Sequence, residues 1–292
     1  MDFLTGIAKD LARQSRISGP RNLLKPPAGF LLGAMLVAHA GLCQNGANPQ
    51  PEPVVPLAAQ AASRATPSVR KSIKGLPGKV LNDQGPVFSF PLRAVQGHHW
   101  KPALAVTLAT TGLVLLDSHD TPYFRRTQSF RGFNRTFSGV NTGIGEGTFP
   151  LALFLAGRVR HSGYMQQTAF QAAEALADAQ ILSEVMKNVS RRLRPREIPP
   201  TGDYGHTWFK EGGGILIDRG SFPSGHAIGA FAVAAVVARR YPRHRWVPWV
   251  AYGAAALVGF SRISLQAHFP SDIFAGAALG YSIGHFVVLR RH

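Results

Sequence analysis

Six apolar segments separated by polar loops dominate the sequence from Trp100 onward. Their hydrophobic positions recur at helical spacing, whereas the alternating pattern of β-strands is scarce. Small residues pervade the last three segments, and such residues allow helices to pack closely. The pattern therefore predicts an all-α fold, a bundle of about six helices. The segments cover roughly residues 101–117, 143–157, 165–190, 226–240, 246–262 and 272–289.

Acidic residues interrupt the apolar pattern of two of these segments. Glu174, Asp178 and Glu184 recur at helical spacing along 165–190, and Glu146 lies in 143–157. Carboxylates are costly in lipid, and the segments are short against the roughly 20 apolar residues that a membrane span requires. The sequence therefore leaves open whether the helices span a membrane or form a soluble or peripherally bound bundle.

The first 95 residues differ from the bundle in composition. A basic stretch precedes an apolar run at 28–43, in which Ala38-His39-Ala40 fits a small-residue cleavage site. Residues 44–95 are rich in Pro, Ala, Gln and Ser and show little periodicity, which is typical of a linker. The predicted organisation is a secretory signal or anchor at 1–43, a linker at 44–95 and a helical domain at 96–292.

Composition and charge narrow the possible partners. The chain has 292 residues, of which 45% are hydrophobic, and a formal charge of +17 that is not confined to one tail. Such a charge indicates an anionic partner, surface or substrate. Nucleic acid is not the expected partner, because zinc-ligand spacing, basic leucine-zipper heptads and RNA-binding aromatic signatures are not found. The single cysteine, Cys43, excludes an intrachain disulfide and a cysteine-based metal site.

Three polar clusters fall on one end of an up-down bundle built from these segments. The first is Lys187 to Pro195 after the third segment, the second is Pro223-Ser224-Gly225-His226 before the fourth, and the third is Ser261 to Asp272 between the fifth and sixth. Two helix N-termini at the same end favour bound anions through free N–H groups and the helix dipole. We therefore expect the active site at this end of the bundle.

The cationic and small residues of these clusters suit a phosphate group. Lys187, Arg194 and Arg262 supply fixed positive charge, and the arginines can contact phosphate oxygens in pairs. Ser224 and Gly225 add a hydroxyl and backbone N–H donors, and glycine lets the backbone approach an oxyanion closely.

The remaining residues permit phosphoryl transfer without a metal. One of the histidines, His226 or His268, could attack phosphorus while the other protonates the leaving oxygen. Asp272, four residues after His268, could hold the Nδ1 proton of that imidazole and leave Nε2 free. Taken singly, a histidine near a helix end is more often a surface residue, and Asp272 could be a helix cap. The inference therefore rests on the three clusters occurring together.

The three clusters resemble the motifs of the type 2 phosphatidic acid phosphatase superfamily, which also contains bacterial class A acid phosphatases and vanadium haloperoxidases. Those motifs are K-x6-R-P, P-S-G-H and S-R-x5-H-x3-D. All three occur here without substitution and in the family's order, and the resemblance covers about residues 100–292. In this sequence they read Lys187-x6-Arg194-Pro195, Pro223-Ser224-Gly225-His226 and Ser261-Arg262-x5-His268-x3-Asp272.

The resemblance implies hydrolysis of a lipid or small organic phosphomonoester or diphosphate through a phosphohistidine, without a metal or other cofactor. His268 would be the nucleophile, Asp272 its orienting partner and His226 the general acid. The phosphate-binding residues would be Lys187, Arg194, Ser224, Gly225 and Arg262.

Two other functions agree with part of the sequence. A vanadium-dependent haloperoxidase would use the same pocket, because vanadate mimics pentacoordinate phosphate, but nothing halide-specific is identifiable. A non-catalytic basic envelope protein that binds anionic lipid would account for the charge of +17. It would not account for two histidines and an aspartate at the family's spacing.

The expected location is the bacterial inner membrane or the periplasm, with membrane association. Basic clusters after the second, fourth and sixth segments indicate cytoplasmic loops and place the active end on the non-cytoplasmic side. An anchor at 28–43 that delivers the linker outside would reverse this topology if every later segment spans. The sequence names neither the substrate nor the oligomeric state.

Overall fold

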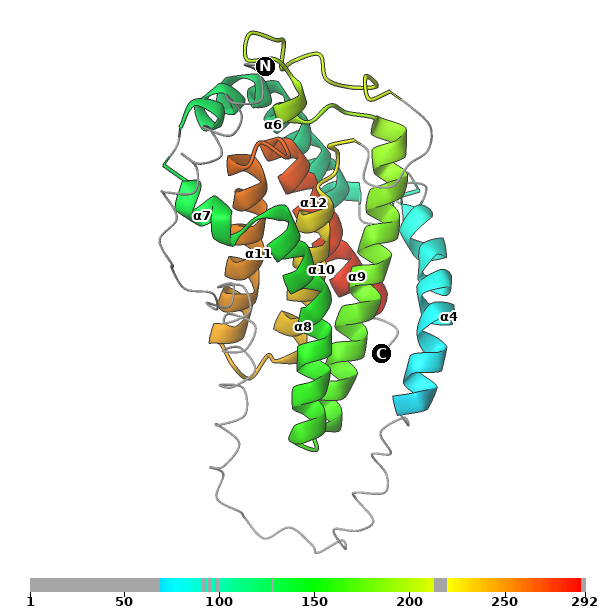
Figure 1. Cartoon of the computed structure of the whole chain (residues 1–292). Coiled ribbons are helices and arrows are strands. Elements are labelled where there is room, and N and C mark those ends of the chain that lie inside the picture. The colour runs from blue at the N-terminus through cyan, green and yellow to red at the C-terminus, as the bar shows by residue number, and fades with distance from the viewer. Residues whose placement is uncertain are drawn as a thin grey trace, which may run out of the picture.

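The computed structural model describes residues 69–90, 93, 96, 97, 100–127, 129–212 and 220–289, and within them every regular element is helical. The predicted all-α class is thus confirmed, with the helices gathered into a bundle (Figure 1). The predicted signal or anchor at 1–43 lies outside the described residues. The elements are α4 (Val69–Phe88), α6 (Trp100–Arg126), α7 (Arg131–Thr136), α8 (Gly139–Val159), α9 (Gly163–Ser190), η1 (Pro195–Glu197), α10 (Gly225–Arg240), α11 (Trp246–Ser264), α12 (Pro270–Ser282) and η2 (Ile283–Val288).

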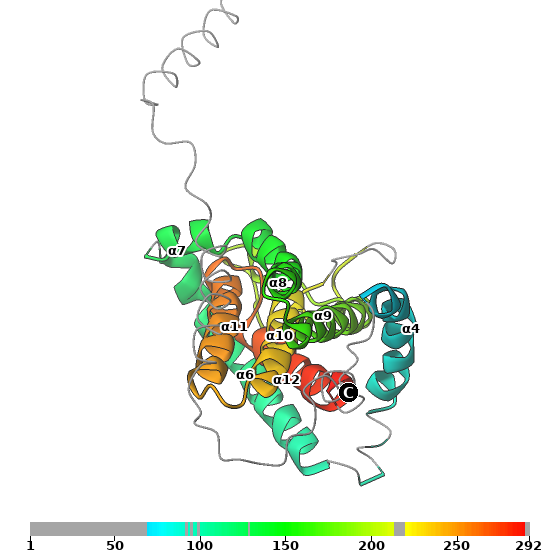
Figure 2. The same cartoon turned by 90° about the horizontal axis from the view of Figure 1, so that it is seen from below.

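Helix α10 lies at the centre of the bundle, where it packs against α9, α11 and α12 (Figure 2). Its sequence is alanine- and valine-rich, and nearly all of its residues are buried. Small side chains on a central helix let three neighbours approach it at once. The helix begins at the end of the bundle where the three polar clusters were predicted to meet.

Glycines on α12 and its continuation η2 allow the closest helix contact in this core. A Cβ atom added at Gly280 would lie 2.2 Å from the carbonyl oxygen of Ile228, and one at Gly284 would lie 2.5 Å from that of Ala232. A Cβ at Gly276 would lie 3.0 Å from the carbonyl oxygen of Ser224. The row of glycines therefore fixes α12 against the first half of α10 and carries that contact up to the predicted site.

Helix α4 corrects part of the predicted linker at 44–95. It packs against α9, where Gln84 Nε2 donates to Asp178 Oδ1 at 2.8 Å and Lys79 Nζ lies 3.8 Å from Glu174 Oε2. Its hydrophobic contribution is small, with Val87 as its member of the main core. These contacts are polar, so apolar periodicity did not reveal the helix. Two acidic residues of α9, Glu174 and Asp178, face it.

Helices α6 and α7 correct the predicted loop at 118–142. Helix α6 runs past the predicted end at residue 117, because Asp117 and Thr121 are buried on its inner face. Helix α7 follows, and Phe133 stacks on Phe137 at a centroid distance of 4.6 Å beside Phe260 of α11. Buried polar residues and a local aromatic cluster thus form structure where the sequence suggested a loop.

The length and hydropathy of the described helices bear on whether they could span a membrane. In the part of the chain that the structure describes, no helix is both long enough and apolar enough to cross a membrane.

Replacement of Gly280 by alanine tests the contact between α10 and α12. The added methyl group would overlap the Ile228 carbonyl, and overpacking of this kind costs about 1–3 kcal/mol. Chemical denaturation should therefore show a lower free energy of unfolding for Gly280→Ala. The matched control is Gly253→Ala on α11, where nothing lies within 4 Å of the new methyl group. Alanine should stabilise that helix by roughly 0.5–1 kcal/mol, and equal effects at both positions would contradict the packing described.

Candidate active site

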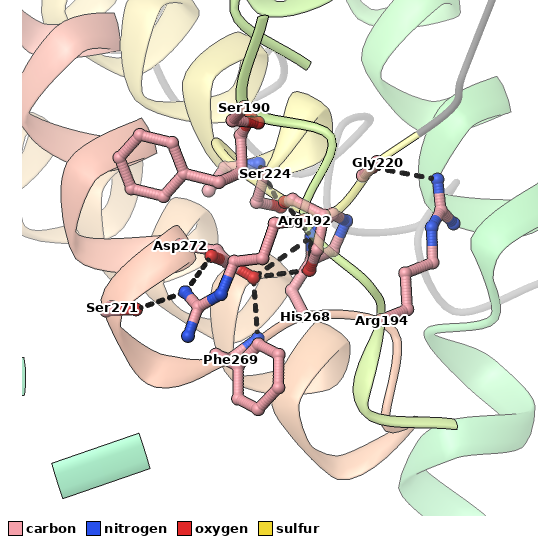
Figure 3. A network of polar contacts seen from close by, with 12 residues as sticks. Ser190, Arg192, Arg194, Gly220, Ser224, His268, Phe269, Ser271 and Asp272 are labelled. Atoms are coloured by element: carbon pink, nitrogen blue, oxygen red, sulfur yellow. Dashed lines mark hydrogen bonds and ion pairs between the residues drawn. The ribbon is translucent and has the colours of Figure 1, made fainter. Parts of the chain in front are cut away.

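The three predicted clusters meet at one end of the bundle, joined by backbone hydrogen bonds. Ser221 N donates to the Arg192 carbonyl at 2.7 Å, which ties the segment before α10 to the segment after α9. Ser224 N donates to the Asp272 carbonyl at 3.2 Å, and Arg196 N donates to the Gln266 carbonyl at 3.0 Å. These contacts bring the predicted site residues together from α9, α10 and the α11–α12 connection (Figure 3).

His268 lies buried just before α12, with one ring nitrogen held by the backbone. Its Nδ1 lies 2.7 Å from the carbonyl oxygen of Ser221. Because a carbonyl can only accept, Nδ1 carries the proton and Nε2 is left with a free lone pair. Burial lowers the pKa of His268, while the nearby carboxylate of Asp272 acts in the opposite direction. At neutral pH the imidazole is therefore uncharged.

Asp272 is placed differently from the expectation that it holds the Nδ1 proton directly. Its Oδ2 lies 3.7 Å from His268 Nδ1, beyond hydrogen-bond distance. The same oxygen accepts the Ser221 hydroxyl at 2.5 Å and the Phe269 N–H at 2.8 Å. Asp272 thus acts on His268 through charge and through Ser221, and it also caps the first turn of α12.

Ser221 is a site residue that the sequence analysis missed. Its carbonyl binds the His268 ring and its hydroxyl donates to Asp272, so it lies between the two. It is fully buried. The available signal was its position three residues before Ser224, on the same tight approach to α10.

His226 occupies the first turn of α10 and faces the start of α8. Its Nε2 lies 3.2 Å from the carbonyl oxygen of Gly139. Burial, with help from the positive charge of Arg262, lowers the pKa of His226 from 6.5 to about 4. His226 is therefore neutral at physiological pH and donates Nε2–H to the backbone.

Arg262 belongs to the same corner of the site. Its Nη2 donates to the Phe137 carbonyl and to Ser261 Oγ, the latter at 2.8 Å. Burial lowers the pKa of Arg262 to about 10, while the charge of Glu146 on α8 opposes that shift. Burial in turn raises the pKa of Glu146 well above its ordinary value. The guanidinium is charged at neutral pH and is held by the segment that joins α7 to α8.

The other predicted phosphate-binding residues come from α9, the segment after it and the start of α10. Lys187 is buried in the last turn of α9, with Nζ 3.0 Å from Glu184 Oε1, and Arg194 Nη2 donates to the Gly220 carbonyl at 3.5 Å. A methyl group on Gly225 would lie 3.2 Å from Lys187 Nζ, so glycine leaves room for this ammonium group. Ser224 caps α10 through Oγ. Its N–H donates to the Asp272 carbonyl and is therefore not a donor for phosphate.

Arg192 is the second residue that the sequence analysis missed. Its side chain is 1% exposed and forms ion pairs with two carboxylates, Asp272 and Asp117, both at 2.6 Å. It lies two positions before Arg194, inside the first motif, where its position gave no sign of a separate role. Asp117 comes from α6, and burial raises its pKa against the opposing hydrogen bonds from Ser271 and Arg192.

The comparison with protein families agrees with this arrangement. The family model described as the PAP2 superfamily matches residues 168–292, a range that contains all three motif clusters. Residues 168–292 of the chain thus match the PAP2 superfamily. The PAP2 match begins within α9, so α4, α6 and Asp117 lie before it.

Curated proteins similar to this chain include lipid A phosphatases. Lipid A 4′-phosphatase of Porphyromonas gingivalis is 34% identical over 108 residues, which cover 37% of this chain and 44% of that protein. Lipid A 1-phosphatase of Rhizobium etli is 28% identical over 198 residues, or 62% of this chain and 80% of that protein. The first match thus spans less than half of its relative's length.

Among solved structures, the transmembrane PAP2 type phosphatidylglycerolphosphate phosphatase from Bacillus subtilis is similar. It aligns with 70% of this chain and 94% of its own, at 23% identity and a TM-score of 0.42.

The lowered pKa of His226 predicts a specific pH dependence of stability. Between pH 6.5 and about 4 the unfolded chain binds a proton at this residue that the folded protein does not, so stability falls as pH falls. Replacement by glutamine removes this contribution. Urea unfolding at pH 7 and pH 4.5 should show the stability difference between His226→Gln and wild type shifting in the variant's favour at the lower pH. The exposed His119 on α6, replaced by glutamine, is the control. A difference that does not change with pH would contradict the assigned environment.

Proposed function

We propose that this protein is a phosphatase of phosphorylated lipids that forms a phosphohistidine at His268. The observation that carries the proposal is the hydrogen bond from His268 Nδ1 to the Ser221 carbonyl at 2.7 Å. It leaves an uncharged imidazole with a free Nε2 lone pair in a site that also holds Lys187, Arg194 and Arg262. A buried neutral nucleophile beside fixed cations suits attack on a phosphate anion.

The first half of the reaction transfers the phosphoryl group to the protein. The Nε2 lone pair of His268 forms a bond to phosphorus while the bond from phosphorus to the ester oxygen breaks. His226 gives its proton to that oxygen, so the alcohol leaves in neutral form. The positive charges of Lys187, Arg194 and Arg262 stabilise the equatorial oxygens as charge spreads over them.

The second half returns the protein to its starting state. A water molecule attacks the phosphohistidine, and His226, now neutral, accepts the proton of the water. The bond from phosphorus to Nε2 breaks, inorganic phosphate leaves, and His268 regains its lone pair. As the phosphate leaves, His226 releases its proton to solvent and becomes neutral again. No metal enters either step of this scheme.

His226 must gain a proton before it can act as the acid. Its pKa is lowered to about 4 by burial and by the positive charge of Arg262. A bound phosphate dianion supplies the opposite charge, which raises the pKa of a neighbouring imidazole. Substrate binding therefore brings the acid into its working form.

Two observations support a lipid as the substrate. The curated relatives are named as phosphatases of lipid A. In addition, Val140 and Ile144 of α8, next to the Gly139 contact of His226, are 71% and 55% exposed, and Phe209 beside the end of α9 is 73% exposed. Apolar side chains around a phosphate site suit acyl chains that remain in a membrane.

The proposed location is the bacterial cell envelope, with the active site on the non-cytoplasmic side. The arginine-rich ends of α8 and α10 lie at the far end of the bundle from the site (Figure 1). Positive charge of this kind favours the cytoplasmic side of a membrane.

Replacement of His268 tests the covalent step. The purified full-length protein should hydrolyse phosphorylated lipids in detergent, and brief mixing with ³²P-labelled substrate followed by quenching should trap an acid-labile, base-stable label. His268→Gln should lose both turnover and label, because no other group takes the phosphoryl group. The control is His119→Gln, at an exposed histidine. Label that persists in His268→Gln would overturn the assignment.

A panel of lipid A phosphorylated at position 1 or 4′, phosphatidate and phosphatidylglycerolphosphate would identify the preferred lipid.

Metal removal and vanadate test the charge arrangement. In the described parts of the chain, no three His, Cys, Asp or Glu side chains are grouped to hold an ion. Activity should therefore survive exhaustive EDTA treatment. Vanadate should inhibit, because its five-coordinate adduct with His268 resembles the transition state. Arg262→Gln should weaken vanadate inhibition and lower kcat/KM together. Activity that EDTA abolishes and zinc or magnesium restores would contradict the metal-free reaction.

A further inference from the structure

A buried cluster of charges behind His268 has no part in the reaction described above. The side chains of Arg192 and Asp117 are both 1% exposed, and that of Asp272 is fully buried. Removing ionised groups from water is costly unless each is well paired. Asp272 connects this cluster to the proposed nucleophile, so its cost calls for a functional reason.

Arg192 is held rigidly by contacts on its nitrogens and on its planar face. Nη1 donates to Asp272 Oδ1 and Nη2 donates to Asp117 Oδ2, both at 2.6 Å, while Nε donates to the Thr207 hydroxyl at 3.1 Å. The guanidinium carbon also lies 4.0 Å from the ring centre of Phe269 and 4.5 Å from that of Trp208. The planar fork of arginine is suited to such a fixed bridge between two carboxylates.

Asp117 in turn anchors Arg192 to the start of α12. Its Oδ2 accepts the Ser271 hydroxyl at 2.5 Å, and its Oδ1 accepts the Ser271 N–H at 3.2 Å. One carboxylate from α6 therefore contacts both the cation and the turn that carries Asp272. Helix α6 packs against α12, so Asp117 contacts the site although α6 carries none of the three motif clusters.

We propose that Arg192 is a positioning residue for His268, acting through Asp272 and Ser221, and that Asp117 holds Arg192 in place. The proposal rests on His268 being the nucleophile of the proposed function.

The geometry shows how the effect reaches the imidazole. Arg192 takes one oxygen of Asp272, which turns the other, Oδ2, toward the Ser221 hydroxyl and His268. The backbone carbonyl of Arg192 also accepts the Ser221 N–H at 2.7 Å. Ser221 in turn supplies the carbonyl that binds His268 Nδ1. Both the side chain and the main chain of Arg192 therefore reach the nucleophile, each through one intermediate residue.

The charge of Arg192 also acts on proton uptake by the His268–Asp272 pair. Burial lowers the pKa of His268, Asp272 raises it, and the charges of Arg194 and Lys187 lower it further. The charge of His268 in turn lowers the pKa of His226. Arg192 lies against Asp272 and also opposes proton uptake by the pair, while Asp117 partly neutralises Arg192. Loss of the Arg192 charge should make the pair bind its first proton at a higher pH, and loss of the Asp117 charge should make it do so at a lower pH.

The test is a direct titration of this pair in the full-length protein. ¹⁵N-labelled histidine and ¹³Cγ-labelled aspartate report proton uptake by NMR, with the signals assigned from His268→Gln and Asp272→Asn. Arg192→Gln should raise the pH of first proton uptake by about 1–3 units, and Asp117→Asn should lower it. The acid limb of kcat/KM should move in the same two directions. Arg192→Lys, which keeps the charge, should return the titration close to that of wild type.

The matched control is Arg240→Gln at the far end of α10. Arg240 also stacks on a ring, at 3.9 Å from the centre of Tyr164, and donates to Thr168 and Gln167 at 3.1 Å. Its loss should lower the melting temperature without moving the titration.

The outcomes separate this proposal from the proposed function. Shifts of the same sign in Arg192→Gln and Asp117→Asn, or no shift in either, would overturn the positioning role, whatever the protein hydrolyses. If Arg192→Gln does not fold, the downward shift in Asp117→Asn, whose side chain is nearly the same shape, decides the matter. If the two variants shift in opposite directions but the wild-type protein hydrolyses no phosphate ester, the positioning role is upheld and the phosphatase is rejected.

Discussion

The close approach of the α10 and α12 backbones is the constraint on which the site depends. His226 begins one helix and His268 precedes the other, so their separation is set by how these helices pack. Three glycines on α12 and η2 remove the side chains that would hold the backbones apart, and the bond from Ser224 N to the Asp272 carbonyl joins their first turns. Because main-chain atoms make the contact, a rotamer change cannot alter it.

Electrostatics then determine what this rigid frame can bind. The charges of Lys187 and Arg194 act on His268, and that of Arg262 acts on His226. Asp272, the carboxylate that acts on His268, is paired with a further cation, Arg192. Both histidines have lowered pKa values as a result of burial and these cations. This concentration of positive charge is what the proposed anionic substrate requires.

Much of this arrangement could be predicted from the sequence, and the exceptions share a cause. The helices with apolar periodicity and the convergence of three motifs follow from local pattern and from up-down topology. Arg192 and Asp117 are 75 positions apart, so no local pattern relates them. The same holds for α4, whose contacts with Asp178 and Glu174 of α9 are polar. Hydrophobic patterning identifies helices that bury an apolar face. Buried polar pairs are recognised only when the positions of both partners in the fold are known.

The carbonyl oxygens at the start of α8 affect how the site empties. The Gly139 carbonyl lies 3.2 Å from His226 Nε2, and the Phe137 carbonyl accepts a hydrogen bond from Arg262. In the proposed reaction, a departing phosphate would otherwise leave these two donors unsatisfied, at about 1–3 kcal/mol for each group. Internal acceptors that replace the product's oxygens lower that cost, at the expense of some affinity for the incoming substrate. In the proposed phosphatase the two carbonyl groups therefore compete with the anion for the same donors, which favours rapid release of the product over tight binding.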